Sequence, residues 1–179
     1  MSRDKYSRRS PVLPIRDKVL IMCGGQTEAI YFNYYKNKHK KDLANISIKV
    51  LTHKKSNPFA DFDKAIILAS ENGVSCAFSN EAIEYWFLLH YENKTGAISR
   101  NALNTELGNK LDFEYDKGAE TIQRTCLKIN NKLLAAEERA QVGHERHIIN
   151  SGEKPSNWCS CTTMYALTKR LREWSKAKK

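Results

Sequence analysis

The feature that most constrains the fold of this chain is an alternation of strand-like runs and helical patterns through its first half. Residues 19–23 form a continuous apolar run, and residues 46–51 and 74–78 are two further strand candidates. A run without polar alternation is typical of a strand that is buried on both faces, as in a parallel sheet. Strands that alternate with helices predict an α/β domain.

Three helices are predicted after these strands. Thr27 is the expected N-cap of the first helix, which runs to about residue 41. The second helix spans about 61–71 and ends at an Asn-Gly pair, which is typical of a helix C-cap. Asn80 is the expected N-cap of the third helix. One stripe of that helix consists of Ile83, Phe87 and His90.

The second half of the sequence is predicted to be helical. Helices are expected at 99–111, 119–140 and 162–176, with a loop at 143–155. The apolar stripes of the last two helices consist of Ile122, Cys126, Ile129 and Leu133, and of Met164, Leu167, Leu171 and Trp174. We therefore expect a small, mostly parallel sheet with helices on both faces, followed by a helical C-terminal half.

One domain is expected, because 179 residues suffice for one hydrophobic core but not for two sizeable domains. Residues 1–17 are polar, basic and interrupted by proline, which predicts a flexible arm. A single domain is expected at 18–179. Its α/β core is placed at about 18–92 and its helical part at about 99–176.

Positive charge is concentrated in three places, and the formal net charge is +10. Residues 1–18 carry six basic against two acidic residues, and residues 160–179 carry six against one, which leaves +1 for the remainder. Residues 36–55 hold seven lysines against Asp42. Such patches suit a polyanion such as nucleic acid, and solvated surface is the alternative. The candidate nucleic-acid-binding residues are Lys36, Lys38, Lys40, Lys41, Lys54 and Lys55.

The five cysteines are an odd number, in a sequence without a recognisable secretory signal or an apolar run near 18 residues. We therefore expect reduced thiols, a cytoplasmic location and no association with membranes. Cys159 and Cys161 could join His144 and His147 as zinc ligands. The C-x-C spacing is poor for zinc, so ordinary packed positions are favoured.

Residues 23–28 form a predicted turn between a strand and a helix, at the edge of the sheet where α/β proteins collect ligands. Gly24 and Gly25 allow close backbone approach, and a helix N-terminus favours an anion. The Gly-Lys-Ser/Thr ending of a Walker A loop is absent. Glu28 could equally serve the helix dipole.

A second acidic pair, Glu81 and Glu84, follows another strand candidate. Residues three apart share a helix face, and two carboxylates so placed could hold Mg²⁺. The alternative is two acids that stabilise a helix N-terminus. His90 lies on the apolar stripe, so a hydrogen-bonded core histidine is the favoured interpretation.

Two stretches resemble motifs of the RloB-like family, bacterial proteins associated with abortive infection and restriction loci. Residues 21–32, IMCGGQTEAIYF, are similar to the family's first-strand motif, and residues 79–90, SNEAIEYWFLLH, are similar to a second, longer motif. The turn at 115–118 and the segment 157–171 also resemble family features, so the resemblance spans nearly the whole chain. The motif residues singled out are Gly25, Thr27, Asn80, Trp86 and His90.

The family resembles Toprim domains, in which acids at strand ends bind Mg²⁺ for phosphodiester chemistry. The resemblance implies a Toprim-like fold and a role in phage defence, as a nuclease effector beside a partner ATPase. The mechanism it implies uses two metal ions that clamp the attacking and leaving oxygens.

The sequence departs from these motifs at the acids. Gly24 stands where the family motif has Glu, and Glu81 and Ile83 stand where it has Pro and Phe. A Toprim site also needs a D-x-D after an apolar strand, but only about nine loop-like residues precede the helix expected at 61, too few for another strand. Asp61 and Asp63 have the D-x-D spacing but align better with the start of that helix.

Glu28 and Glu84 are thus the candidate catalytic residues. With Asp61 and Asp63 they are also the candidate Mg²⁺ ligands, and Glu81 is a possible addition. Two functions stay open. One is a degenerate Toprim-type protein that binds nucleic acid or a partner ATPase with weakened or lost catalysis. The other is an active Mg²⁺-dependent nuclease that cleaves RNA or DNA.

Overall fold

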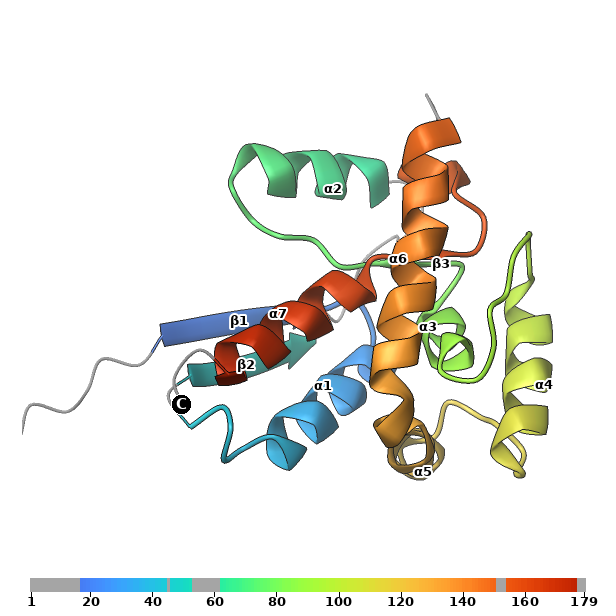
Figure 1. Cartoon of the computed structure of the whole chain (residues 1–179), viewed down its shortest axis with the longest axis horizontal. Coiled ribbons are helices and arrows are strands. Elements are labelled where there is room, and N and C mark those ends of the chain that lie inside the picture. The colour runs from blue at the N-terminus through green and yellow to red at the C-terminus, as the bar shows by residue number, and fades with distance from the viewer. Residues whose placement is uncertain (1–16, 45, 53–61, 151–153, 177–179) are drawn as a thin grey trace, which may run out of the picture.

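The computed structural model describes residues 17–44, 46–52, 62–150 and 154–176. Figure 1 shows a small sheet beside a larger body of helices. The elements in chain order are β1 (Asp17–Cys23), α1 (Gln26–Lys38), β2 (Ile46–Thr52), α2 (Phe62–Glu71), β3 (Ser79–Asn80), α3 (Ile83–Leu89), α4 (Arg100–Leu111), α5 (Ala119–Ile129), the 3-10 turn η1 (Asn130–Lys132), α6 (Leu133–Asn150), η2 (Pro155–Asn157), β4 (Cys161–Thr162) and α7 (Met164–Lys176).

The predicted α/β class is confirmed by β1 and β2, which pair in parallel with α1 as their crossover. The register places Ile21 opposite Val50. On one face of the sheet Ile21, Cys23 and Ile48 are buried. On the other face Leu20 and Met22 are more than half exposed. Burial of the first strand on both faces was therefore a wrong prediction, because the described helices leave these two side chains uncovered.

The third strand was also predicted wrongly. Residues 74–78 form no ladder, and Val74 is 59% exposed. The backbone N–H of Phe78 donates to the Thr163 hydroxyl at 2.9 Å, and the N–H of Thr163 donates to the Phe78 carbonyl at 2.9 Å. The next two residues, β3, pair antiparallel with β4. The chain at this point is therefore held by the segment before α7, far away in the sequence, and not by β1 or β2.

Helix α2 stands apart from the sheet in Figure 1, and none of its residues is buried. It contacts η2, where both carboxylate oxygens of Asp63 accept hydrogen bonds from Ser156. Its predicted end is confirmed, since Gly73 has φ of +66° and the N–H of Val74 donates to the Ala69 carbonyl at 2.8 Å.

Both predicted N-caps of the first half are wrong. Helix α1 begins at Gln26 with Gly25 as its N-cap, and Thr27 is a buried residue inside the helix. Helix α3 begins at Ile83 with Ala82 as its N-cap. The side chain of Asn80 instead donates to backbone carbonyls of the η2 turn, those of Pro155, Ser156 and Trp158.

Helix α3 is the centre of the molecule. All residues from Ile83 to His90 are buried, so the helix is covered all round and has no single apolar stripe. It packs against α4 and α6. On α4 the residues Leu103, Leu107 and Leu111 are fully buried. A short helix can be this apolar only because its neighbours enclose it on every side.

The helical second half differs from the prediction in its breaks. The helix expected at 119–140 is interrupted by η1, and α6 then continues to Asn150, through most of the predicted loop at 143–155. Tertiary contacts explain why the helix continues. The rings of His144 and His147 pack on the ring of Trp158, with centroid distances of 5.5 and 5.9 Å. The stripes predicted for α5 and α7 are confirmed by the burial of Ile122, Cys126, Ile129, Met164 and Leu171.

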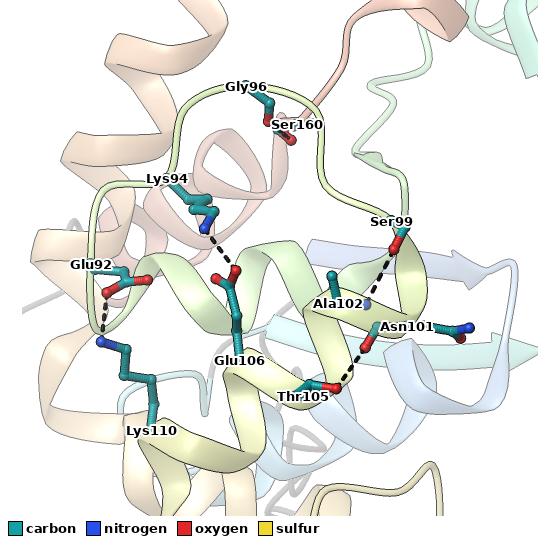
Figure 2. A network of polar contacts seen from close by, with 10 residues as sticks. All are labelled: Glu92, Lys94, Gly96, Ser99, Asn101, Ala102, Thr105, Glu106, Lys110 and Ser160. Atoms are coloured by element: carbon teal, nitrogen blue, oxygen red, sulfur yellow. Dashed lines mark hydrogen bonds and ion pairs between the residues drawn. The ribbon is translucent and has the colours of Figure 1, made fainter.

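The connection between α3 and α4 is fastened by polar contacts (Figure 2). Lys94 pairs with Glu106 at 2.7 Å and Lys110 pairs with Glu92 at 2.6 Å. Ser99 is the N-cap of α4 and accepts a hydrogen bond from the N–H of Ala102 at 3.3 Å. The Ser160 hydroxyl donates to the Gly96 carbonyl, which ties this loop to the segment before β4.

Within the described ranges, no helix combines the length and the apolarity that a bilayer crossing requires. All five cysteines are described, and none forms a disulfide.

Candidate functional site

The structure places the two candidate catalytic acids near enough for their charges to interact. Glu28 lies in the first turn of α1 and Glu84 in the first turn of α3. Burial raises the pKa of Glu28, the negative charge of Glu84 raises it further, and the positive charge of Lys117 opposes both. We call Glu28, Glu84, Tyr115 and Lys117 the acidic cluster.

Glu84 is the most deeply buried carboxylate in the part of the chain that the structure describes, with 1% of its surface exposed. The Tyr115 hydroxyl donates to Glu84 Oε1 at 3.0 Å, and Lys117 Nζ lies 3.2 Å from the same oxygen. A buried charge is costly unless it is paired and hydrogen-bonded, and Glu84 has both kinds of partner.

A turn before α5 positions these two partners. Asp116 Oδ1 accepts a hydrogen bond from the Gly118 N–H at 2.7 Å, and hydrogen bonds from Thr121 and Gly118 lower the pKa of Asp116. Asp116 therefore stabilises the start of α5. The residues on either side of it, Tyr115 and Lys117, both reach Glu84.

The glycine turn after β1 shapes the other side of the cluster. A Cβ added at Gly25 would lie 2.7 Å from Glu28 Oε2, so the carboxylate rests close against this residue. A Cβ at Gly24 would meet no atom within 4 Å. Burial, followed by the charge of Glu28, raises the pKa of Cys23 to about 11. Cys23 is therefore a thiol at neutral pH, which argues against a role as a nucleophile.

The donor set of the acidic cluster does not fit a two-magnesium centre. Two-metal sites hold their ions with several oxygen ligands, and Mg²⁺ demands near-octahedral coordination. Here two carboxylates are present, and one of them is paired with an ammonium group. Across the residues that the structure describes, no group of three His, Cys, Asp or Glu side chains could hold a metal ion.

The other candidate metal ligands do not add to this cluster. Asp61 lies outside the described residues. Asp63 binds Ser156, at 2.9 Å to its N–H and 2.6 Å to its hydroxyl. Glu81 is half-buried before α3 and is not among the charges that shift the pKa of Glu28.

The remaining motif residues have structural contacts. Trp86 is fully buried, and its ring packs edge-on to His90 with centroids 4.8 Å apart. His90 Nδ1 lies 2.9 Å from the Trp86 carbonyl, and burial lowers the pKa of His90 to about 4. His90 is thus a neutral core histidine, in agreement with the favoured interpretation of the sequence.

The histidines considered for zinc are packed in the aromatic cluster around Trp158. His144 Nδ1 lies 3.0 Å from the Tyr165 hydroxyl, and His147 Nε2 lies 3.1 Å from the Cys159 carbonyl oxygen. Cys161 is buried in β4, and burial raises its pKa to about 12. These contacts are those of ordinary packed positions.

The candidate nucleic-acid-binding lysines gather at one end of α1. Lys36 and Lys38 lie in its last turn, and Lys40 and Lys41 lie exposed in the turn that follows. Lys54 and Lys55 fall outside the described residues. His39, within this group, packs on Tyr35 and lies 3.7 Å from Asp42.

Two members of the acidic cluster, Tyr115 and Lys117, were not predicted as site residues from the sequence. In the sequence, the turn at 115–118 resembles a family feature but indicates no site. The one sequence signal for these two residues is their position on either side of Asp116, a residue type that forms turns. Their 31- and 33-residue separations from Glu84 gave no reason to pair them with it.

The comparison with known protein families agrees with the motif resemblance. The RloB-like protein family matches residues 52–171, which is more than half of the chain. The matched region contains the second motif and the turn at 115–118, whereas the first motif, at 21–32, precedes it. No curated protein and no solved structure matches the chain. The chain is a member of the RloB-like protein family.

Proposed function

We propose that this RloB-like protein binds nucleic acid through the lysines at the end of α1, and that its acidic cluster has lost the capacity for two-metal catalysis. The observation that carries the binding is the concentration of Lys36, Lys38, Lys40 and Lys41 within six residues without an acid between them. Phosphate backbones bind such groups by releasing counterions.

The state of Glu84 supports the loss of catalysis. Its Oε1 already has the Lys117 ammonium and the Tyr115 hydroxyl as partners. A metal ion would have to compete with this ammonium for the same oxygen. Gly24 stands at the position where the family motif has its first-strand acid. Glycine has no side-chain atom that could bind a metal ion.

Binding is tested by fluorescence anisotropy with labelled RNA and DNA at several salt concentrations. The Lys36→Gln, Lys40→Gln, Lys41→Gln triple variant should bind more weakly. The slope of log K against log [salt] should fall by about 2–3, at roughly 0.7–0.9 per lost phosphate contact.

The matched control is the triple variant Lys49→Gln, Lys64→Gln, Lys154→Gln, which removes the same charge from exposed positions outside α1. The control should keep most of the slope. Equal losses in the two variants would show that total charge, and not the α1 end, determines binding. Absence of binding to any nucleic acid would refute the proposed function.

The alternative, a Mg²⁺-dependent nuclease, is supported by one observation: the negative charge of Glu84 raises the pKa of Glu28, so the two carboxylates are close enough to interact. We expect no difference in cleavage of RNA or DNA between Mg²⁺ and EDTA. Gly24→Glu, for which there is space, should be equally inactive. Mg²⁺-dependent cleavage that is lost in Glu84→Gln and kept in Glu137→Gln, a buried acid outside the cluster, would establish the nuclease instead.

A role in phage defence and a partner ATPase stay predictions from the family resemblance. Co-expression of a tagged chain with the ATPase of its own defence locus would test the second. Joint purification is expected if the two proteins form a complex, and separate elution would contradict it.

A further inference from the structure

A groove runs between α1 and α5, apart from the acidic cluster. Its volume is about 650 Å³, within the range of about 300–1,000 Å³ that is common for ligand sites. The residues that line it are Ile30, Asn33, Tyr34, Asn37 and Lys38 of α1 and Gln123 and Leu127 of α5. In Figure 1 these two helices lie next to each other, below the sheet.

The α1 side of the groove is one continuous stripe of the helix. Its positions are spaced by three and four residues, so their side chains point in one direction. Ile30 and Tyr34 are half-buried, whereas Asn33, Asn37 and Lys38 are exposed. The stripe therefore presents an aromatic ring flanked by amides, with a cation at its end.

Helix α5 adds one more polar and one apolar side chain to the groove. Gln123 adds a third amide, and Leu127, which is 66% exposed, adds an apolar wall. No carboxylate lines the groove. An aromatic face, amide donors and acceptors, and a lysine are the groups that stack on a base, read its edge and hold its phosphate.

We propose that this groove takes an unpaired base of single-stranded nucleic acid, with Tyr34 as the stacking platform and Lys38 at the phosphate. This inference rests on the proposed function and names the site at which the strand is held. Charge complementarity supports the choice of occupant, because Lys36, Lys40 and Lys41 continue from the same end of α1. A duplex keeps its bases stacked, so it has no free base face to offer.

The test uses the full chain and a fluorescein-labelled 12-nucleotide oligo(U), with a 12-base-pair RNA duplex beside it. Tyr34→Leu should weaken binding of the single strand about tenfold, which is about 1.4 kcal/mol, because the base loses the aromatic side chain on which it stacks. Tyr34→Phe should restore it. The salt slope should stay unchanged in Tyr34→Leu and fall by about 0.7 in Lys38→Gln.

A second variant guards against loss of folding. Asn33→Ala combined with Asn37→Ala alters two exposed side chains and should weaken single-strand binding severalfold while the duplex affinity stays the same. Its control is the pair Asn101→Ala and Asn109→Ala on exposed positions of α4, which should change neither affinity. Circular dichroism and the thermal midpoint establish that each variant is folded.

The outcomes separate the two proposals. If the groove variants bind like the wild type while the α1 lysine variant does not, the groove inference is wrong and the proposed function stands. If no nucleic acid binds, both are wrong. Competition by polyglutamate as effective as that by unlabelled oligo(U), or equal losses for duplex and single strand in Tyr34→Leu, would also overturn the base-binding groove.

Discussion

At the scale of single residues, the pairing of Glu84 with Lys117 distinguishes this acidic cluster from a free metal site. The carboxylate is nearly inaccessible, while the Lys117 side chain is about half exposed. Water therefore reaches the cation but hardly reaches the anion. Removal of Lys117 would leave Glu84 buried with Tyr115 as its hydrogen-bond donor and with the charge of Glu28 nearby.

We predict that Lys117→Met destabilises the protein by about 1–3 kcal/mol, because a hydrogen bond to a buried charge is lost, although water screens part of the effect. Urea unfolding measures the change. The double variant Glu84→Gln, Lys117→Met should lose less than the sum of the two single variants, since the buried charge is removed together with its partner. Strict additivity would contradict the ion pair.

At the scale of elements, the molecule is organised around α3. This short helix is enclosed by α4 and α6, and it delivers Glu84 from its first turn. Helix α4 contributes three fully buried leucines to the same core. Two ion pairs, Lys94 with Glu106 and Lys110 with Glu92, tie the second half of α4 to the loop that follows α3.

Leu107→Ala is expected to destabilise the protein by about 2–5 kcal/mol, because it removes a fully buried side chain and leaves a cavity against α3. Leu134→Ala is the matched control on α6, where the side chain is 64% exposed, and it should change stability by no more than about 0.5 kcal/mol. Urea unfolding of both variants compares them directly. A similar small loss in both would show that α4 is not part of the core.

At the scale of the whole molecule, a buried histidine links folding to pH. Burial lowers the pKa of His90 from 6.5 to about 4, so between these values the unfolded chain binds a proton that the folded protein does not. Stability should therefore decrease as pH falls from 6.5 towards 4, by roughly 3 kcal/mol for this group.

The prediction is checked by urea unfolding of the wild type and His90→Gln at several pH values from 7 to 4. The variant should lose less stability than the wild type over this interval, because its side chain does not titrate. The difference between the two curves gives the contribution of His90 alone. Carboxyl groups that titrate in the same pH range, such as Glu28, contribute equally to both curves. Parallel curves would rule out His90 as the source of the acid sensitivity.

Much of the fold could be predicted because local patterns carry it. The first two strands, the α2 C-cap and the stripes of α5 and α7 follow from apolar spacing or from residues adjacent in the chain. Predictions failed where a distant segment decides the outcome. Phe78 pairs with Thr163 and not with the parallel sheet, and α6 continues where His144 packs on Trp158.

The sequence by itself determined the α/β class, the family motifs, the concentration of lysines at 36–41 and the absence of an acid at position 24. Only the tertiary structure decided that the charge of Glu84 acts on Glu28, that Lys117 and Tyr115 both reach Glu84 Oε1, and that an α1 stripe faces an open groove. The physical reason is the distance along the sequence over which each kind of interaction acts. Periodicity and capping act over a few residues, whereas these contacts join residues more than thirty positions apart through packing around α3.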